Sequence, residues 1–418
     1  MQRKKIIVVG GGASGMLAAL YAARSGAQAT LLERNEKLGK KLYITGKGRC
    51  NVTNASDMEQ YQRNIFRNPR FLYAAFAQLD NVGLMELLEE LGVRLKTERG
   101  NRVFPVSDKS SDIISALRRG LEGEGVEIRL NTRVSRLLIE DGRCVGTELA
   151  DGGRLYADAV ILATGGLSYP STGSTGDGHE MARDAGHTAT ATMPALVSID
   201  TVESWPGTLA GLTLKNVTLS AYVAGGKKEK RLYSQMGELL FTHTGISGPL
   251  ALTLSSLLPE DLSAVRMEID LKPALDEQTL DARLLRDFRE MSRKQLSNVV
   301  DGLVPRSLSL QLIRLAGLSP TMPVNGITAQ QRAALMNTIK GIPLHPKAFG
   351  GFNEAIITRG GVSVKEINPS TMQSKLVKGL FFCGELMDVD AATGGFNLQI
   401  AFSTGALAGK SAATQADD

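Results

Sequence analysis

The spacing of hydrophobic and polar residues predicts a strand, a helix and a second strand at the start of the chain. Ile6–Val9 is a short β-branched run, as expected for a buried parallel strand. Small and apolar residues at helical spacing follow over Ser14–Arg24, and Gly26 ends the predicted helix. Thr30–Glu33 predicts the next strand. Together these segments form a βαβ unit of about 30 residues.

Further along, the pattern predicts hairpins and then an insertion. Between residues 126 and 164, Asp141-Gly142 and Asp151-Gly152 separate strand-like runs, the last of which is the apolar Ala159–Ala163. Residues 217–223 and 265–271 alternate apolar with polar side chains, which predicts half-buried antiparallel strands. From residue 276 the period becomes helical, and Thr328 and Gln331 form a predicted capping box. The pattern returns to strand after residue 345 and ends in a helix over 396–409, so the fold class is α/β with an inserted middle part.

Composition is that of a globular protein with a mild basic excess. The formal net charge of +5 is spread over 418 residues, so no specific nucleic acid is expected. The largest basic cluster, Lys227–Arg231, follows Gly225-Gly226 and is interpreted as a solvated hairpin. The chain has 45 glycines, above the usual share of about 7%. They gather after apolar runs, which indicates close approach of the backbone to a ligand.

Cysteine usage favours a reducing, cytoplasmic location. Cys50, Cys144 and Cys383 are far apart and form neither a disulfide framework nor a CxxC pair. No apolar run approaches the roughly 18 residues that span a bilayer. The apolar stretch near the N-terminus is interrupted by Gly10–Gly12, which argues against a signal peptide and against membrane attachment. No metal site is expected.

The strongest chemical signal is the glycine pattern at Gly10, Gly12 and Gly15. It follows a strand and opens a helix, and Glu33 lies about 20 residues further on, as a dinucleotide site requires. Gly10 permits the tight turn, Gly12 lets the backbone approach a diphosphate, and Gly15 allows close helix packing. The helix N-terminus offers free N–H groups to the phosphates, and Glu33 is expected to accept from ribose hydroxyls.

Two further segments favour FAD over NAD. The antiparallel meander ends in the turn Ala163–Gly166, and the chain closes with Gly384-Glu385, Asp388 and Gly394–Asn397 before the last helix. That helix would direct its N-terminus at the flavin N1/C2 carbonyl, where negative charge develops on reduction. Glu385 and Asp388 suit contacts with the ribityl chain. The alternative for Glu385 is a solvated carboxylate in a turn.

The segment Thr45–Asn54 combines glycines with Arg49, Cys50 and two asparagines. It is interpreted either as a cap and turn or as a loop that wraps the diphosphate and ring with backbone donors and Arg49. Cys50 is expected to be a packing or flavin-contact residue rather than a redox centre.

These residues carry a resemblance to a known family. The chain resembles the BaiN/RdsA-type flavoproteins, the YhiN family of bacterial NAD(P)/FAD-dependent oxidoreductases, over nearly its whole length. The resemblance rests on Val9–Gly15, Thr45–Asn54, Phe241–Pro249, Thr358–Val362 and Gly384–Gln399. One branch of that family reduces unsaturated steroid-type rings.

The resemblance implies a Rossmann-like FAD-binding domain in two parts, residues 1–193 and 346–418. An insert at 194–345 would divide them, with a β-barrel part at 194–275 and a helical part at 276–345. It implies non-covalent FAD contacts at Ser14, Glu33, Arg34, Lys41, Gly46, Arg49, Cys50, Asn51, Val134, Thr164, Gly384, Glu385, Asn397 and Ile400. The motifs above add Gly10, Gly12, Ala13, Gly15, Thr45, Gly48, Ala163, Gly165, Gly166, Asp388, Gly395 and Gln399 as candidates.

Catalytic candidates must reach the flavin ring. The segment after Thr164 is expected to cross near it, so Tyr169 or Thr172 could donate to a substrate carbonyl, and a purely structural loop is the alternative. His243 is a candidate proton donor or a structural contact. Arg359 could bind an anionic substrate or the cofactor, or lie on the surface.

The leading hypothesis is an FAD-dependent oxidoreductase that transfers hydride between NAD(P)H and a small unsaturated organic substrate through flavin N5. No second GxGxxG follows a strand, so a nicotinamide would dock transiently. The alternatives are a flavin oxidase or amine dehydrogenase that uses oxygen or a quinone, and a flavin-containing RNA-modification or redox-sensing factor.

Overall fold

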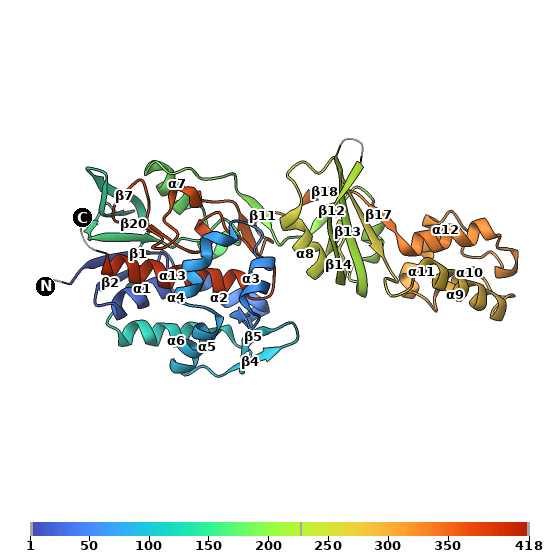
Figure 1. Ribbon diagram of the computed structural model, residues 1–418, viewed down its shortest axis with the longest axis horizontal. Coiled ribbons are helices and arrows are strands. Elements are labelled where there is room, and N and C mark those ends of the chain that lie inside the picture. Colours follow the sequence, from blue (N-terminus) through green and yellow to red (C-terminus); the bar gives the residue numbers. More distant parts are fainter. Residues whose placement is uncertain (1–2, 226–227, 416–418) are drawn as a thin grey trace. The chain divides into compact units, whose positions relative to one another are not determined.

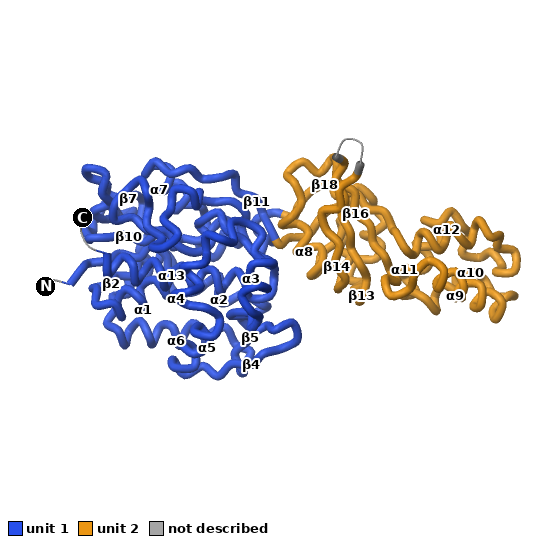
Figure 2. Tube along the Cα trace, in the orientation of Figure 1, with its two compact units in different colours: residues 1–195, 351–418 blue, residues 196–350 orange. Residues whose placement is uncertain are grey.

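The computed structural model describes residues 3–225 and 228–415, which fold as two compact units (Figure 2). Unit 1 comprises residues 1–195 and 351–418, and unit 2 comprises residues 196–350. The strand at Pro346–Phe349, assigned to the first domain by the sequence, pairs instead within unit 2. Residues 226–227, in the predicted basic hairpin, lie outside the described residues, and the strands on either side of them pair.

Unit 1 is built on a parallel sheet of five strands in the order β20-β10-β1-β2-β6. The strands are β1 (Lys5–Val9), β2 (Gln28–Leu32), β6 (Glu127–Arg129), β10 (Ala159–Leu162) and β20 (Leu380–Phe382). All four residues of β10 are buried, since both faces of a parallel sheet are covered. The predicted βαβ unit and the buried strand at 159–163 are confirmed.

Helix α1 (Ala13–Arg24) and the final helix α13 (Phe396–Thr414) pack along each other (Figure 1). Gly405 and Gly409 make this close approach possible. A Cβ at Gly405 would lie 2.2 Å from the carbonyl oxygen of Ser14, and one at Gly409 would lie 2.1 Å from that of Ala18. Helix α13 therefore packs directly against the backbone of α1.

The remaining elements of unit 1 form smaller sheets and covering helices. The predicted antiparallel meander is the sheet β7-β8-β9, and a second sheet has the order β3-β5-β4. Their bounds and those of the other elements are β3 (Thr53–Asn54), β4 (Leu95–Glu98), β5 (Arg102–Pro105), β7 (Val134–Glu140), β8 (Arg143–Leu149), β9 (Arg154–Tyr156), β11 (Met193–Ala195), β19 (Ile357–Arg359), α2 (Lys40–Ile44), α3 (Met58–Asn64), α4 (Tyr73–Gln78), α5 (Asn81–Glu90), α6 (Ser110–Gly123) and α7 (Asp177–Asp184).

Unit 2 contains a seven-stranded sheet in the order β17-β16-β13-β14-β15-β12-β18. Its strands are β12 (Ile199–Thr201), β13 (Thr213–Gly225), β14 (Lys228–Phe241), β15 (Gly245–Ser247), β16 (Val265–Asp270), β17 (Ile342–Leu344) and β18 (Pro346–Phe349). The two ends of this order, β17 and β18, are separated in the chain by His345 alone. One residue cannot span the width of a flat sheet, so the sheet curls round on itself like the predicted barrel.

The helices of unit 2 are α8 (Gly248–Leu257), α9 (Glu277–Glu290), α10 (Leu296–Val300), α11 (Arg306–Leu315) and α12 (Ala329–Lys340). The predicted capping box is present at the start of α12: Thr328 and Gln331 each accept from the other's backbone N–H. Pro249 occupies the first turn of α8, as its missing N–H allows. Across the described part of both units, no helix has the length and apolar character that crossing a membrane would require.

His187, buried in unit 1, gives an expected pH dependence of stability. Ser374 Oγ accepts the amides of Leu376 and Val377, so its hydrogen is left to donate to Nε2 of His187, 2.8 Å away. Burial lowers the pKa of His187, although Glu366 opposes the shift. The unfolded chain then binds the proton more readily, so the free energy of unfolding is expected to fall as the pH drops below about 6.5.

Urea unfolding at several pH values measures this effect. His187→Gln is expected to weaken the pH dependence, and His345→Gln, at a half-exposed histidine of unit 2, serves as the control. Equal pH dependence in wild type and His187→Gln would contradict the assignment.

Candidate functional site

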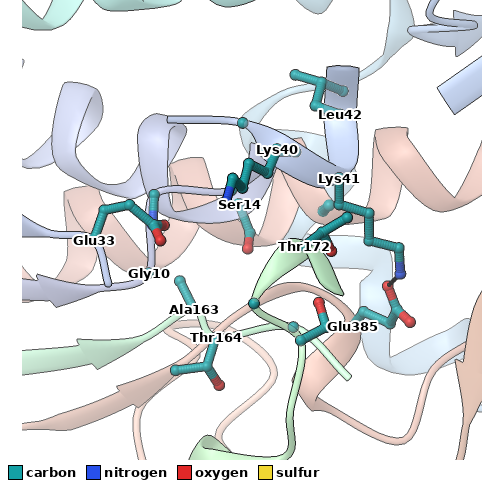
Figure 3. Close-up of a pocket in the computed structure, with 18 of the residues that line it drawn as sticks. Gly10, Ser14, Glu33, Lys40, Lys41, Leu42, Ala163, Thr164, Thr172 and Glu385 are labelled. Carbon is teal, nitrogen blue, oxygen red and sulfur yellow. Dashed lines mark hydrogen bonds and ion pairs between the residues drawn. The ribbon is translucent and has the colours of Figure 1, made fainter. Parts of the chain in front are cut away.

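A long pocket lies in unit 1 where β1, β2 and β10 end, and it encloses about 1340 Å³ including its open mouth. Its wall comes from segments far apart in the chain: the turn after β1, the end of β2, α2, the loop after β10 and the start of α13. In Figure 3, Glu33 lies on one side of Gly10 and Ser14, and Lys41 and Glu385 lie on the other. Ligands of open α/β sheets bind at this edge, where parallel strands end.

The three motif glycines have different geometric roles. Gly10 has a φ of +107°, and a Cβ there would lie 2.5 Å from the carbonyl oxygen of Ala163. A Cβ at Gly15 would lie 1.8 Å from the carbonyl oxygen of Gly10, so helix and strand touch at that point. Gly12 differs, because no atom lies within 4 Å of its Cβ position. That open space belongs to the pocket.

Two helix N-termini meet the pocket without side-chain caps. Gly12 precedes α1 and Gly395 precedes α13, and neither helix has an acidic residue in its first turn. Ala13 and Ser14 of α1, and Asn397 of α13, lie on the wall. The unpaired N–H groups and the positive dipole end of each helix therefore favour an anionic or electron-rich ligand.

Glu33 lies on the wall at the end of β2 and is 7% exposed. Its Oε2 accepts from the amide of Gly11 at 2.7 Å, and its Oε1 accepts from the amide and the side chain of Asn35 at 2.8 and 2.7 Å. A carboxylate fixed in this way keeps acceptor capacity for a further donor. A ribose hydroxyl would supply such a donor.

The opposite end of the pocket carries an ion pair within a hydrogen-bond network. Nζ of Lys41 lies 2.6 Å from Oε2 of Glu385 and donates to Oγ of Ser168 at 2.6 Å. Oε1 of Glu385 accepts from Ser168 Oγ and from the amide of Thr358. Burial opposes ionisation of Glu385, but the charge of Lys41 and these hydrogen bonds outweigh it and lower the pKa of the carboxyl. Glu385 is not the solvated turn carboxylate of the alternative hypothesis.

The structure brings most of the candidate residues to one wall. Those that line the pocket are Gly10, Gly12, Ala13, Ser14, Glu33, Arg34, Lys41, Thr45, Val134, Ala163, Thr164, Gly165, Thr172, Glu385, Asn397 and Ile400. Those that lie off the wall are Gly15, Gly46, Gly48, Arg49, Cys50, Asn51, Gly166, Gly384, Asp388, Gly395, Gln399, Tyr169 and His243.

Several residues off the wall support it by packing. A Cβ at Gly384 would lie 2.5 Å from Oγ of Ser14, one at Gly395 would lie 2.3 Å from the carbonyl oxygen of Thr53, and one at Gly166 would lie 2.4 Å from Oγ1 of Thr358. Gln399 is fully buried and accepts from Oγ1 of Thr53 at 2.6 Å. These positions shape the pocket from behind.

The Arg49 side chain lies off the pocket wall and forms ion pairs with two carboxylates. Its Nη2 lies 2.5 Å from Oε1 of Glu98 and 2.6 Å from Oδ1 of Asp108, and its guanidinium lies 4.1 Å from the ring centroid of Phe104. Hydrogen bonds to Glu98 and then Asp108 raise the pKa of Arg49. Of the two interpretations of the segment at 45–54, a cap and turn or a loop around the diphosphate, these contacts fit the first: the guanidinium joins the segment to β4, β5 and the turn after β5.

All three cysteines are free and buried. Burial raises the pKa of the Cys50 thiol to about 12, that of Cys144 to about 11 and that of Cys383 to about 12.

Because the thiolate is the reactive form of cysteine, iodoacetamide is expected to label none of the three cysteines in the folded protein. Mass spectrometry measures this, with the urea-unfolded chain as the control in which all three react. Labelling of native Cys50 would contradict the packing role.

The catalytic candidates belong to different units, Tyr169 and Thr172 to unit 1 and His243 to unit 2. Oγ1 of Thr172 donates to the carbonyl oxygen of Tyr169 at 2.7 Å, so the hydroxyl is engaged in its own turn. Tyr169 has a φ of +53° and lies off the wall. His243 is exposed in unit 2, in the turn between β14 and β15. Asp388 lines a separate depression with Thr188 and Glu366, and burial raises its pKa.

Some residues that line the pocket were not among the predicted site residues. Asp177, at the start of α7, pairs with Arg34 at 3.2 Å and with Arg133 at 3.0 Å. Ile356 and Ile357 add an apolar patch to the wall. The position of Arg133 beside the candidate Val134 was an available signal, whereas nothing in the local pattern of Asp177 indicates a site.

A glycine turn between a parallel strand and a helix, opening on a long pocket at the sheet edge, defines a dinucleotide-binding protein. The family model described as the HI0933-like protein Rossmann domain matches residues 4–411, and the chain belongs to this family. It is an oxidoreductase, which confirms the enzyme class and the family resemblance predicted from the sequence.

Relatives and a solved structure extend over the whole chain. A 3-dehydro-bile acid delta(4,6)-reductase of Clostridium scindens is 33% identical over 98% of this chain and 99% of its own length. A ribosomal RNA dihydrouridine synthase of Escherichia coli is 28% identical over 97% of this chain and 96% of its own. The structure of 3-ketosteroid delta1-dehydrogenase from Sterolibacterium denitrificans covers all of both chains with a TM-score of 0.55 at 14% identity, a likeness of fold.

Proposed function

We propose that the pocket binds FAD and that the protein reduces a carbon–carbon double bond of a small unsaturated substrate with electrons from NAD(P)H. The observation that carries the proposal is the shape of the pocket wall, with an open glycine position and two uncapped helix N-termini between Glu33 and the Lys41–Glu385 pair. When bound, FAD would supply hydride-transfer chemistry at its N5 position.

The residues present fit this cofactor. The space at the Cβ position of Gly12 is free for a diphosphate, and the amides of Ala13 and Ser14 are available to it. Oγ1 of Thr164, on the wall, is buried and has no hydrogen-bond partner among the described residues. A buried hydroxyl without a partner is costly, so a polar ligand group there would stabilise it.

In this proposal the two ends of the pocket bind different halves of the cofactor. Glu33 holds the adenosine ribose and disfavours a 2′-phosphate, because both groups carry negative charge. Lys41 and Glu385 offer a charged donor and acceptor to the opposite half of the cofactor. Leu42, Ile356 and Val389 exclude water from the wall on which the ring would lie.

The reductase of Clostridium scindens supports an unsaturated ring as the substrate class. A second candidate is reduction of uridine in RNA, favoured by the relative named ribosomal RNA dihydrouridine synthase. Both reactions add a hydride and a proton across a double bond. They differ in whether the substrate is small or a polymer.

Purification and anaerobic reduction test the proposal. The protein is expected to be yellow, to release FAD on denaturation, and to bleach on addition of NADPH or NADH. The reduced protein is then mixed with an unsaturated 3-ketosteroid or with RNA transcribed in vitro, and reoxidation identifies the acceptor. A colourless protein that takes up no FAD contradicts the cofactor, and bleaching by an amine alone favours the amine dehydrogenase alternative.

A further inference from the structure

The Lys41–Glu385 pair lies on the pocket wall but is shielded from bulk water. The Lys41 side chain is 22% exposed and the Glu385 side chain 20% exposed. Both residues line the pocket, and Figure 3 draws their contact at the end away from Glu33. Charges in such a place are weakly screened, so each acts on whatever occupies that end.

Two segments, the loop after β10 and strand β19, fix the pair in place. Ser168, in the loop after β10, contacts both partners, and Thr358 of β19 donates its amide to Glu385. Oγ1 of Thr358 in turn accepts from the amides of Leu167 and Ser168 at 2.7 and 3.0 Å. A Cβ at Gly166 would meet Thr358 and Glu385, so only glycine allows this packing. The two charges are therefore held together.

A pair built in this way carries no net charge. Glu385 is ionised, as its lowered pKa indicates, and Lys41 supplies the matching positive charge. Lys41 has three N–H donors, of which two are used within the pair and by Ser168. The pair therefore offers one further hydrogen bond to the pocket without an uncompensated charge.

We propose that Lys41 and Glu385 form a charge-balancing pair that sets how readily the flavin ring accepts electrons. The inference rests on the proposed FAD site and goes beyond it, because it assigns the pair to electron affinity rather than to cofactor retention. An oxidised ring becomes electron-rich on reduction. Loss of Glu385 leaves Lys41 unbalanced and favours the electron-rich ring, whereas loss of Lys41 leaves Glu385 unbalanced and disfavours it.

Sulfite titration of the FAD-loaded protein tests this without turnover. Sulfite adds through sulfur to flavin N5, donates its electron pair and places negative charge on the ring, with loss of visible absorbance. Glu385→Gln is expected to bind sulfite at least about tenfold more tightly than wild type, and Lys41→Met at least about tenfold more weakly. The double variant is expected to return to within about threefold of wild type, since both charges are absent.

Two control variants test whether the expected change in sulfite affinity is specific to the Lys41–Glu385 pair or follows from removing a charge anywhere on the protein. Glu59→Gln alters an exposed pair with Arg63, and Lys37→Met alters a lysine that lies near Tyr43 and off the wall. Both are expected to leave the sulfite dissociation constant unchanged.

The outcomes distinguish the inference from the proposed function. Singles that retain FAD and bind sulfite like wild type, or that shift it in the same direction, overturn the charge balance and leave the FAD site standing. Singles that lose FAD also overturn it, because the pair would then hold the cofactor. A wild-type protein that takes up no FAD overturns the proposed function and this inference with it.

Discussion

Gly12→Val is expected to give a folded protein that no longer retains FAD. The backbone of Gly12 is extended, with φ −81° and ψ −170°, which valine adopts readily, and its Cβ position is empty. The free energy of unfolding of the apoprotein should therefore stay within about 1 kcal/mol of wild type. The two methyl groups would occupy the space proposed for the diphosphate, so the affinity for FAD should fall by at least about 100-fold.

Urea unfolding and FAD titration measure the two quantities separately. Gly123→Val is the matched control, because Gly123 ends α6, has open space around its Cβ position and lies off the pocket wall. It should bind FAD like wild type. Tight FAD binding by Gly12→Val would place the diphosphate elsewhere.

Gly405→Val is expected to destabilise the fold itself. A Cβ at Gly405 would lie 2.2 Å from the carbonyl oxygen of Ser14, which belongs to the backbone of α1 and cannot rotate away. Such overpacking should cost about 3 kcal/mol in the free energy of unfolding, more than the small gain in helix propensity from replacing glycine. Because Ser14 is on the pocket wall, FAD binding should weaken as well.

Lys410→Val supplies the control on the same helix. Lys410 is exposed and its Nζ donates to Oε1 of Gln78 at 2.8 Å, so valine there tests β-branching without the clash. Its unfolding midpoint in urea should lie close to that of wild type. An equally stable Gly405→Val would show that the two helices can separate at no cost.

The elements that depend on residues adjacent in sequence could be predicted from the sequence. The strand, glycine turn and helix around Gly10 follow from residues adjacent in sequence, and so does the capping box at Thr328. The sequence motif also predicted separate roles for the three glycines: a tight turn at Gly10, backbone approach to a ligand at Gly12 and close packing at Gly15. Their geometry agrees, since a Cβ at Gly10 or Gly15 would meet backbone atoms and one at Gly12 would meet nothing within 4 Å.

The partners of several side chains and glycines could not be predicted, because they lie in segments far away in the sequence. Arg49 has the chemistry of a phosphate ligand, and nothing near it reveals that Glu98 and Asp108 meet its guanidinium. Asp177 joins Arg34 and Arg133 only after folding. Likewise, the apolar pattern of the last helix does not reveal that Gly405 and Gly409 face α1. Each depends on tertiary structure that no window of sequence contains.

The two ends of the insertion have a consequence for how such a protein can diversify. Strand β12, which enters unit 2, pairs antiparallel with β18, which leaves it, and β11 and β19 pair in the same way in unit 1. The outgoing and returning chain are therefore neighbours on both sides of the junction. A module attached by adjacent ends can be lengthened, exchanged or removed in evolution while the host core keeps its own hydrogen bonds and packing.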